Sequence, residues 1–265
     1  MKLSVIVPCY NESENVTKLY NELLPVIRNI VDSGRINSEF EVTSTELIFV
    51  DDGSNDFTTD KLVDRFGGES TDRLTIRFLR HEKNLGLGAA IRTGLSNAIG
   101  DILLTADSDG TYRFSDIPGM LALLTAGIDI VTASPYHPDG MVAGVPASRL
   151  ILSRGSSFIY RILVDWHVYT YTCLFRAYRA EVVRDISFEA NDFLGGTELL
   201  VKAILRGYRV AEFPAVLYKR QYGVSKAKIA RTVMSHLGFQ WKVLAQKILV
   251  NFGIKPMQSF KKKAS

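Results

Sequence analysis

The sequence predicts an α/β fold in which a mostly parallel sheet is flanked by helices. Short apolar runs alternate with segments of helical periodicity through the first half of the chain. Several of these runs are almost entirely apolar, as strands buried on both faces are. Two of them lead into acidic clusters, at residues 51–52 and 107–109. Repeated strand–helix units produce parallel sheets, and their ligands collect beyond the carboxyl ends of the strands.

The elements of the first half follow in a regular order. The apolar runs predict strands at 3–8, 46–50, 74–79, 102–106 and 128–133. The helical patterns between them predict helices at 15–31, 59–66, 89–98 and 117–124. The polar segment 33–44 is predicted to be an exposed insertion.

The second half is less regular. Residues 134–146, rich in proline and glycine, are predicted to form a long loop, and loops of this length are usually functional or disordered. Helices are predicted at 149–164, 197–206 and 229–252, and a strand at 210–218. We therefore expect a catalytic domain over 1–228, followed at 229–265 by an amphipathic helix and a basic tail.

Composition excludes several classes of protein. The net charge of +4 is modest and the basic residues are scattered, apart from a cluster at 261–263, so no nucleic-acid partner is expected. The 2 cysteines favour a reducing, cytoplasmic compartment. The apolar start is too short for a signal peptide, and no run of about 18 apolar residues predicts a spanning helix. A soluble or peripheral protein is expected.

Asp107 and Asp109 form the strongest candidate site. Carboxylates at positions i and i+2 of an extended segment point the same way, so both could bind one hard cation. Mg²⁺ is typically held by one or two carboxylates, while substrate phosphates and water fill the remaining positions. A solvated acidic turn is the alternative interpretation.

Two other strand ends carry candidate ligand-binding residues. After the first strand, Tyr10 offers a ring for base stacking and Glu12 an acceptor for a base or ribose, although an ordinary turn explains the same residues. After the second, Asp51 could accept hydrogen bonds from a ribose or base. Helix capping suffices to explain Asp52 and Ser54.

Basic residues and one further carboxylate occur in the second half. Arg154 and Arg176 stand in an otherwise apolar or aromatic stretch and could bind phosphate, with salt bridging as the alternative. A polar loop with Arg220, Ser225 and Lys226 suits closure over a pyrophosphate, though a solvated basic turn would look the same. Glu198, near a helix start, is either a catalytic carboxylate or a partner of the helix dipole.

Glycines at 86, 88 and 94 superficially resemble a dinucleotide fingerprint. They do not follow the first strand, and no acidic residue stands at the usual offset. Tight turning and close packing of a helix on the sheet are the favoured explanation.

Taken in order, five motifs resemble the inverting glycosyltransferases of family 2. The motifs are Val-Ile-Val-Pro-Cys-Tyr-Asn-Glu at 5–12, Val-Asp-Asp-Gly-Ser at 50–54, Asn-Leu-Gly-Leu-Gly at 84–88, Asp-Ser-Asp-Gly at 107–110 and Arg-Gln-Tyr-Gly-Val-Ser-Lys at 220–226. The resemblance extends to about residue 228. It is greatest to the polyprenyl-phosphate sugar synthases of the dolichyl-phosphate mannose or glucose type, because Phe-Arg-Ala-Tyr-Arg at 175–179 and Gly-Val-Ser-Lys at 223–226 point to that branch. The Gln-Xaa-Xaa-Arg-Trp motif of processive enzymes is absent from the sequence.

This resemblance implies a GT-A fold, a nucleotide-sugar donor such as a GDP- or UDP-hexose, and Mg²⁺ or Mn²⁺ at Asp107 and Asp109. It implies a donor nucleotide pocket at Pro8, Tyr10, Glu12, Asp51 and Asp107. The phosphates or the acceptor would meet Arg154, Arg176, Arg220, Ser225 and Lys226. Thr111 stands where the mannose synthases commonly have a metal-coordinating Gln, and residues 171–174 replace their usual Thr-Ser-Gly.

The expected reaction is a single displacement with inversion, to a polyprenyl phosphate acceptor. A lipid phosphate is already anionic, so no strong general base is required. If the acceptor were a hydroxyl of a glycan or glycolipid, a carboxylate such as Glu198 would have to take its proton. A nucleotidyltransferase and a non-catalytic scaffold are the remaining alternatives. Nucleotidyltransferases usually have a glycine-rich basic loop after the first strand, and residues 8–12 of this sequence do not form one. The presence of both Asp107 and Asp109 argues against a non-catalytic scaffold.

The last helix bears on the acceptor. On a helical wheel, His236 and Gln240 share one side, and Trp241, Ile248 and Leu249 share the other. Core packing is one explanation. The other, together with the basic tail, is a helix lying on the cytoplasmic face of an anionic membrane.

Overall fold

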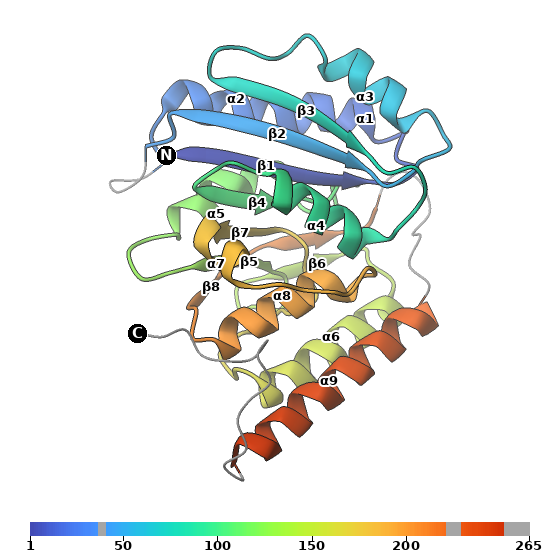
Figure 1. The fold of residues 1–265 in the computed structure, drawn as a ribbon, viewed down its shortest axis with the longest axis vertical. Helices are drawn as coiled ribbons and strands as arrows, with labels where there is room; N and C mark the ends of the chain where they lie inside the picture. The colour runs from blue at the N-terminus through green and yellow to red at the C-terminus, as the bar shows by residue number, and fades with distance from the viewer. Residues whose placement is uncertain (37–40, 221–228, 252–265) are drawn as a thin grey trace.

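The computed structural model describes residues 1–36, 41–220 and 229–251. Its centre is a seven-stranded sheet with the order β3–β2–β1–β4–β7–β5–β8, and β6 and β9 form a separate two-stranded sheet (Figure 1). The strands of the main sheet are β1 Lys2–Cys9, β2 Ser44–Asp51, β3 Leu74–Arg80, β4 Ile102–Thr105, β5 Ile130–Ser134, β7 Arg176–Arg179 and β8 Val210–Pro214. The small sheet consists of β6 Met141–Ala143 and β9 Val216–Tyr218.

Helices connect most of these strands. They are α1 Val16–Lys18, α2 Leu24–Ser33, α3 Thr58–Phe66, α4 Leu87–Asn97, α5 Ile117–Ala122, α6 Ala147–Leu163, α7 Ala180–Asp185, α8 Leu194–Leu205 and α9 Ile229–Asn251. A π-helical turn, Leu19–Leu23, joins α1 to α2, and a 3₁₀ turn, Phe114–Asp116, precedes α5.

The predicted mostly parallel α/β sheet is confirmed. β1 pairs in parallel with β2 and β4, β2 with β3, and β5 with β8. The exception is β7, which lies between β4 and β5 and is antiparallel to both. The sequence analysis did not predict β7 or α7. Both elements are short, and β7 has an arginine at each end instead of forming an apolar run.

Two apolar layers cover the two faces of the sheet. Along β1, Val5 and Val7 belong to one buried cluster and Ile6 to the other, as the two-residue period of a strand requires. The first cluster includes side chains from α1, α2, α3 and α5. The second includes side chains from α4, α8 and α9. The strand ends between these layers are therefore held by core packing on both sides.

Two predicted elements are divided in the structure. The helix expected over 15–31 is interrupted by the π-helical turn. The strand expected over 210–218 is two strands in different sheets, because Pro214 pairs with Ser134 in the main sheet and Val216 pairs with Met141 in the small one. A continuous apolar pattern carries no signal for a strand that changes sheets.

Helix α9 packs side by side with α6 and also contacts α8 (Figure 1). It buries Phe239 and Val243, and its polar residues His236 and Gln240 also face the body of the protein. Within the described residues, no helix has the length and apolar character needed to cross a membrane.

Candidate active site

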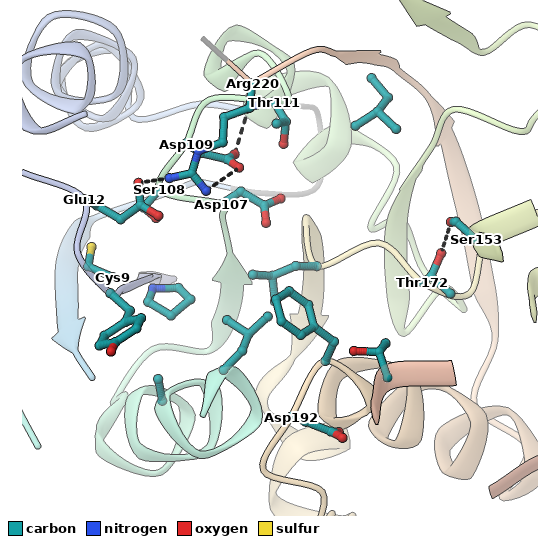
Figure 2. A pocket seen from close by; sticks show the side chains of 18 of the residues that line it. Cys9, Glu12, Asp107, Ser108, Asp109, Thr111, Ser153, Thr172, Asp192 and Arg220 are labelled. Carbon is teal, nitrogen blue, oxygen red and sulfur yellow. Dashed lines mark hydrogen bonds and ion pairs between the residues drawn. The ribbon is translucent and has the colours of Figure 1, made fainter. Parts of the chain in front are cut away.

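A cleft of about 920 Å³ opens at the carboxyl ends of β1, β2 and β4. Pro8, Tyr10 and Glu12 reach it from the end of β1 and the loop after it, and Asp107 and Asp109 from the turn after β4 (Figure 2). Neighbouring parallel strands end at the same edge of a sheet, so the fold brings together two motifs that lie about a hundred residues apart. The cleft is the place where the sequence analysis expected a ligand.

Among the carboxylates of the cleft, Asp107 has the pKa that is raised most. Its burial, together with the negative charges of Asp109 and Glu12, raises its pKa to about 8. Loss of hydration and repulsion between carboxylates both oppose ionisation. A cation bound at this point would relieve both effects.

The chemistry of the donor set fits Mg²⁺ or Mn²⁺. Asp107 and Asp109 supply two carboxylates, and Thr111 lines the same cleft. Among the described residues, no group of three or more His, Cys, Asp or Glu side chains could hold a metal ion. A hard cation bound by two carboxylates would leave positions for phosphate oxygens and water, as Mg²⁺ prefers.

Arg220 lies between two of these acids. Its guanidinium forms an ion pair with Glu12, and a second one with Asp109 at 3.6 Å (Figure 2). Glu12 also accepts a hydrogen bond from the side-chain amide of Asn15 at 2.6 Å. Burial raises the pKa of Glu12, and the charge of Arg220 opposes that rise. Arg220 thus lies at the carboxylates of the cleft, and its contact with phosphates stays a prediction. Ser225 and Lys226 lie outside the described residues.

Thr111 is fixed through its backbone. Its N–H donates to Asp109 at 3.1 Å, and its carbonyl accepts a hydrogen bond from the N–H of Tyr218 at 2.9 Å. The turn that carries both aspartates is therefore attached to β9, the last strand before Arg220.

Asp51 and Asp52 have different positions although they are neighbours. Asp51 is buried and accepts hydrogen bonds from Ser54 and Thr59, and it does not line the cleft. Asp52 lines the cleft and accepts hydrogen bonds from the N–H groups of Leu85 and Gly86, at 2.9 and 2.8 Å. The structure thus gives Asp51 a turn-stabilising role and places Asp52 where the sequence analysis expected Asp51.

Comparison with known proteins identifies the family. Residues 4–187 match the family model described as "Glycosyl transferase family 2". The chain belongs to glycosyltransferase family 2. This confirms the resemblance drawn from the five motifs, and it makes the protein a glycosyltransferase.

Two curated relatives are similar over most of this chain. A polyprenol monophosphomannose synthase of Mycolicibacterium smegmatis is 32% identical over 228 residues, 84% of this chain and 79% of that protein. A dolichol-phosphate mannosyltransferase of Pyrococcus furiosus is 28% identical over 246 residues, 92% of this chain and 64% of that protein. The chain therefore spans less than two thirds of the Pyrococcus protein.

A solved structure has the same fold. Glucosyl-3-phosphoglycerate synthase from Mycobacterium tuberculosis, in complex with Mn²⁺, UDP and glucosyl-3-phosphoglycerate, superposes with a TM-score of 0.60 at 19% identity. The match covers 96% of this chain and 81% of that one. The predicted GT-A glycosyltransferase fold is confirmed.

Arg176 lies away from the cleft of this glycosyltransferase. Its side chain is fully buried and donates to the hydroxyl of Thr132 at 3.0 Å and to the carbonyls of Gly196 and Tyr171 at 2.6 and 2.5 Å. It therefore connects β5, the loop before β7, and α8. Its donors point to two carbonyls and a hydroxyl of the protein and not to a phosphate in the cleft.

Arg154 also does not line the cleft. It is exposed on α6, and its guanidinium lies 5.2 Å from the ring centre of Tyr136, whose side chain does line the cleft. Cation–π contact of this kind fixes an aromatic ring. Arg154 thus supports the wall of the site.

Glu198 is buried, and its carboxylate is bound by other groups of the protein. Its carboxylate accepts hydrogen bonds from the N–H groups of Glu189 and Ala190, at 3.1 and 2.9 Å, and forms an ion pair with Lys202 at 2.5 Å. It does not line the cleft. It holds the loop before α8, and the structure does not bring it to an acceptor.

Gly86 and Gly88 explain the glycine-rich segment. A Cβ at these positions would lie 2.2 Å from the carbonyl oxygen of Asn191 and 2.1 Å from that of Ala190. A Cβ at Gly94 would lie 2.3 Å from Ile6 on the sheet. Close backbone approach and sheet packing, as favoured from the sequence, account for these glycines.

The sequence analysis missed several residues that line the cleft. They include Asp52, Asn84, Ser153, Thr172, Asp192 and Arg231. Asn84 belongs to a recognised motif, and Asp52 to another, so a signal for these two existed. Thr172 lies in the segment 171–174 that departs from the mannose synthases, so the sequence marked its position but not its role. The other three stand in segments without a motif, and long-range packing brings them to the cleft.

Proposed function

We propose that this protein is a metal-dependent, inverting hexosyltransferase that moves a hexose from a GDP- or UDP-hexose to a polyprenyl phosphate. The observation that carries the proposal is the cleft in which Asp107, Asp109 and Arg220 meet at the carboxyl edge of the sheet. The names of the two curated relatives, a polyprenol monophosphomannose synthase and a dolichol-phosphate mannosyltransferase, support this acceptor class.

Asp107 and Asp109 would hold Mg²⁺ or Mn²⁺, with Thr111 beside them. When bound, the cation supplies positive charge that neutralises the nucleoside diphosphate as it leaves. Arg220 lies at the same carboxylates and can contact the phosphates with its fork of N–H donors. Complexes of the M. tuberculosis structure with Mn²⁺ or Mg²⁺ and UDP support this use of a cation.

Pro8, Tyr10, Glu12 and Asp52 would form the wall for the nucleoside. The ring of Tyr10 is available for stacking a base. The carboxylate of Asp52 accepts hydrogen bonds from the backbone N–H groups of Leu85 and Gly86, and these bonds fix the wall there. Asp51 supports this wall from behind through Ser54, whose hydroxyl also accepts a hydrogen bond from the N–H of Asn11 at 2.8 Å.

The carboxylates that line the cleft already have partners or a proposed role, and this favours a phosphate acceptor over a hydroxyl acceptor. Five described residues with carboxylates line the cleft: Glu12, Asp52, Asp107, Asp109 and Asp192. Glu12 is paired with Arg220, and Asp52 accepts backbone N–H groups. Asp192 accepts the N–H of Leu194 at 3.0 Å and the hydroxyl of Ser235 at 2.5 Å. With Asp107 and Asp109 assigned to the cation, each of the five has another role. A hydroxyl acceptor needs a proton-accepting base, whereas an anionic phosphate does not.

The outer sides of α6 and α9 support a membrane-bound acceptor. We define the apolar face as Ile151, Phe158, Ile162 and Trp166 with Met234, Leu237, Trp241 and Ile248, all of which are exposed. Exposed apolar side chains gathered on two neighbouring helices are typical of protein or membrane contacts. Pro146 and Leu150 near the start of α6, and Arg231 and Thr232 near the start of α9, line the cleft. A lipid phosphate arriving along these helices would therefore reach the mouth of the cleft.

In this proposal residues 1–228 form the catalytic domain, and 229–265 form the segment that contacts the cytoplasmic membrane face. The inward side of α9 packs on the domain, and its apolar outward side meets the lipid headgroups. The basic cluster at 261–263 lies outside the described residues.

A donor-by-acceptor screen tests the proposed function. The full chain is incubated with GDP-mannose, GDP-glucose, UDP-glucose or UDP-galactose, with Mn²⁺ or Mg²⁺, and with polyprenyl phosphate or a hydroxyl glycolipid. We expect extractable glycosyl polyprenyl phosphate that EDTA abolishes. Transfer to the hydroxyl acceptor alone, or transfer unaffected by EDTA, would contradict the proposal.

A further inference from the structure

Arg161, in the last turn of α6, lies between two aromatic rings. Its guanidinium carbon is 4.3 Å from the ring centre of Trp166 and 4.1 Å from that of Tyr169. Its Nε donates to the backbone carbonyl of Trp166 at 3.1 Å. Aromatic rings at such distances attract the cation and fix the plane of the guanidinium. The side chain is therefore held in one orientation by the protein itself.

The other donors of this guanidinium are available to a ligand. Among the described residues, Arg161 forms no ion pair, and its two terminal nitrogens have no hydrogen-bond partner. The neighbouring acid, Asp165, accepts hydrogen bonds from the backbone N–H and the imidazole of His167, at 2.9 and 3.1 Å. The terminal N–H groups of an arginine form a planar fork that matches two oxygens of a phosphate. The free edge of Arg161 thus suits a phosphate group.

This position is separate from the cleft. Arg161, Trp166 and Tyr169 are not among the described residues that line it. Leu150, on the same helix, does line the cleft, and Arg161 stands about three turns, or about 16 Å, further along the helix axis. A phosphate bound by Arg161 would therefore be neither that of the donor nor that of an acceptor in the cleft.

The surroundings of Arg161 favour a membrane lipid over a soluble phosphate. The rings of Phe158 and Trp166 pack edge to face with their centres 6.0 Å apart, and they are 50% and 53% exposed. Both belong to the apolar face defined above, as does Trp241 on α9. The sequence has 2 tryptophans, so every tryptophan of the chain is exposed on this face. Tryptophan is typical of the boundary between a membrane and water, at the level of the headgroups.

The charge of the two helices favours an anionic headgroup. The sequences of α6 and α9 contain arginine and lysine but no aspartate or glutamate. Arg154 is exposed on the same side of α6 as Arg161, since seven residues complete almost two turns, and Lys242 is exposed on α9 next to Trp241. A zwitterionic headgroup would bring a cation to this surface, and neither helix has an acid to pair with it. An anionic phospholipid brings negative charge alone.

We propose that Arg161, held between Trp166 and Tyr169, binds the headgroup phosphate of an anionic phospholipid while the apolar face enters the lipid. The inference rests on the membrane contact in the proposed function. It deepens that contact by naming the class of lipid and the residue that binds it. A guanidinium already fixed by two rings loses little conformational freedom when a phosphate binds, so this contact is stronger than one from a freely moving side chain.

Vesicle partitioning tests the assignment. The full chain is mixed with vesicles of phosphatidylcholine alone, or of phosphatidylcholine with phosphatidylglycerol, and the bound fraction is measured by flotation. Arg161→Gln is compared with the wild type. Arg65→Gln is the matched control, because Arg65 also lies over a ring, 6.0 Å from the centre of Tyr20, but on α3 at the far end of the molecule (Figure 1). A thermal melt of each variant shows whether it is folded.

We expect the wild type to bind the vesicles with phosphatidylglycerol more tightly than those without. Arg161→Gln should weaken binding to the anionic vesicles about five- to tenfold, because one charged contact at the membrane surface is lost. It should leave the weaker binding to phosphatidylcholine almost unchanged, since the choline cation beside that phosphate opposes Arg161. Arg65→Gln should change neither.

The fluorescence of Trp166 reports the position directly. Trp241→Phe leaves Trp166 as the one tryptophan of the sequence. With Arg161 intact, we expect brominated lipid in the anionic vesicles to quench this fluorescence, and inorganic phosphate without vesicles to leave it unchanged. A change with submillimolar inorganic phosphate alone would assign Arg161 to a soluble phosphate and overturn the proposal.

Three further results would overturn it. The first is equal partitioning of the wild type into the two kinds of vesicle, a comparison that needs no variant. The second is a folded Arg161→Gln that binds both kinds equally less well, or that behaves as Arg65→Gln does. The third is unquenched Trp166 in vesicle-bound protein. All of them leave glycosyl transfer, which the donor-by-acceptor screen measures, unaffected. No binding of the wild type to either kind of vesicle would instead refute the proposed membrane contact together with this assignment.

Discussion

At the scale of single residues, the site depends on where neighbouring carboxylates point. Asp51 and Asp52 are adjacent, yet one is buried in a turn and the other lines the cleft. Pairing Asp51 with Ser54 and Thr59 turns it from the cleft. A motif specifies which residues occur at a strand end. Which of their side chains lines the cleft depends on the hydrogen bonds that each one forms with surrounding residues.

The same limit applies to Arg176 and Glu198. Both residue types fit a phosphate site or a catalytic base, and the sequence offered these roles. The structure shows that each satisfies protein groups in the interior. Arg176 donates to two backbone carbonyls and to the hydroxyl of Thr132, and Glu198 accepts hydrogen bonds from two backbone N–H groups. Their partners lie in loops whose course no local pattern predicts. By contrast, Asp107, Asp109 and Arg220 line one cleft, although the two aspartates follow β4 of the main sheet and Arg220 follows β9 of the small sheet. Their roles toward a cation and phosphates stay predictions.

We predict that Arg220 competes with a cation for the carboxylates of the cleft. Arg220→Gln removes the guanidinium from Glu12 and Asp109 and leaves their negative charges uncompensated. We therefore expect nucleotide-free Mn²⁺ to bind this variant several-fold more tightly than the wild type, as measured by electron paramagnetic resonance. Arg154→Gln, which removes an exposed arginine without an ion pair to either acid, should bind Mn²⁺ as the wild type does. Weaker or unchanged binding by Arg220→Gln would refute the competition.

At the scale of elements, the sheet was largely predictable and its connections were not. The strands of the first half and the helices between them were predicted from apolar periodicity to within a few residues. The antiparallel strand β7 and the division between β8 and β9 were missed. They depend on which strand a segment meets across the sheet, and no local pattern encodes that.

Glu46 on β2 joins four segments of the sheet. It accepts hydrogen bonds from Ser4 on β1 at 2.5 Å, from the N–H of Ile99 before β4 at 2.7 Å, and from Arg77 on β3 at 3.0 Å. Burial opposes its ionisation, but these donors outweigh burial and hold its pKa below the ordinary 4.5. The folded protein therefore binds this proton less readily than the unfolded chain. The resulting stabilisation is complete above the unfolded pKa and is lost as the pH falls through the folded one.

We predict that Glu46→Gln lowers the free energy of unfolding at pH 7 by about 1–3 kcal/mol, since charge-assisted bonds are lost. The difference from the wild type should shrink as the pH falls below 4.5, because the wild type then loses the same interaction. Urea unfolding at several pH values measures it. Glu22→Gln, at an exposed position, is the control. A destabilisation that stays constant down to pH 3 would show that the charge of Glu46 is not responsible.

At the scale of the whole molecule, the apolar face and the mouth of the cleft lie at the same two helices. The sequence analysis considered α9 alone, with core packing and membrane contact as alternatives. In the structure α9 has a buried side and an exposed apolar side, since Phe239 and Val243 are buried while Trp241 is 70% exposed. The sequence analysis did not assign α6 to the apolar face, because only the fold shows that α6 lies beside α9.

We expect the full chain to float with vesicles that contain phosphatidylglycerol. Replacing Trp241 and Phe158 together with glutamine should weaken partitioning at least about tenfold, because two apolar side chains no longer leave water. Ile99→Gln, at an apolar residue 60% exposed in the turn before β4, should have no effect. Replacing the three lysines at 261–263 separates the electrostatic part, at about 1 kcal/mol for each lysine. Unchanged flotation of the Trp241 and Phe158 double variant would exclude the apolar face as the contact.

The central claim is that Asp107 and Asp109 hold the cation through which the donor binds. Calorimetric titration of UDP and GDP, with Mn²⁺ or with EDTA, measures nucleotide binding and tests this claim most directly. The wild type is compared with Asp109→Asn and with the control Asp116→Asn. We predict that EDTA weakens nucleotide binding by the wild type and by Asp116→Asn at least tenfold, because the phosphates lose their cation. Binding by Asp109→Asn should be weak whether Mn²⁺ is present or not. Nucleotide binding by Asp109→Asn that is as strong and as Mn²⁺-dependent as that of the wild type would contradict the account.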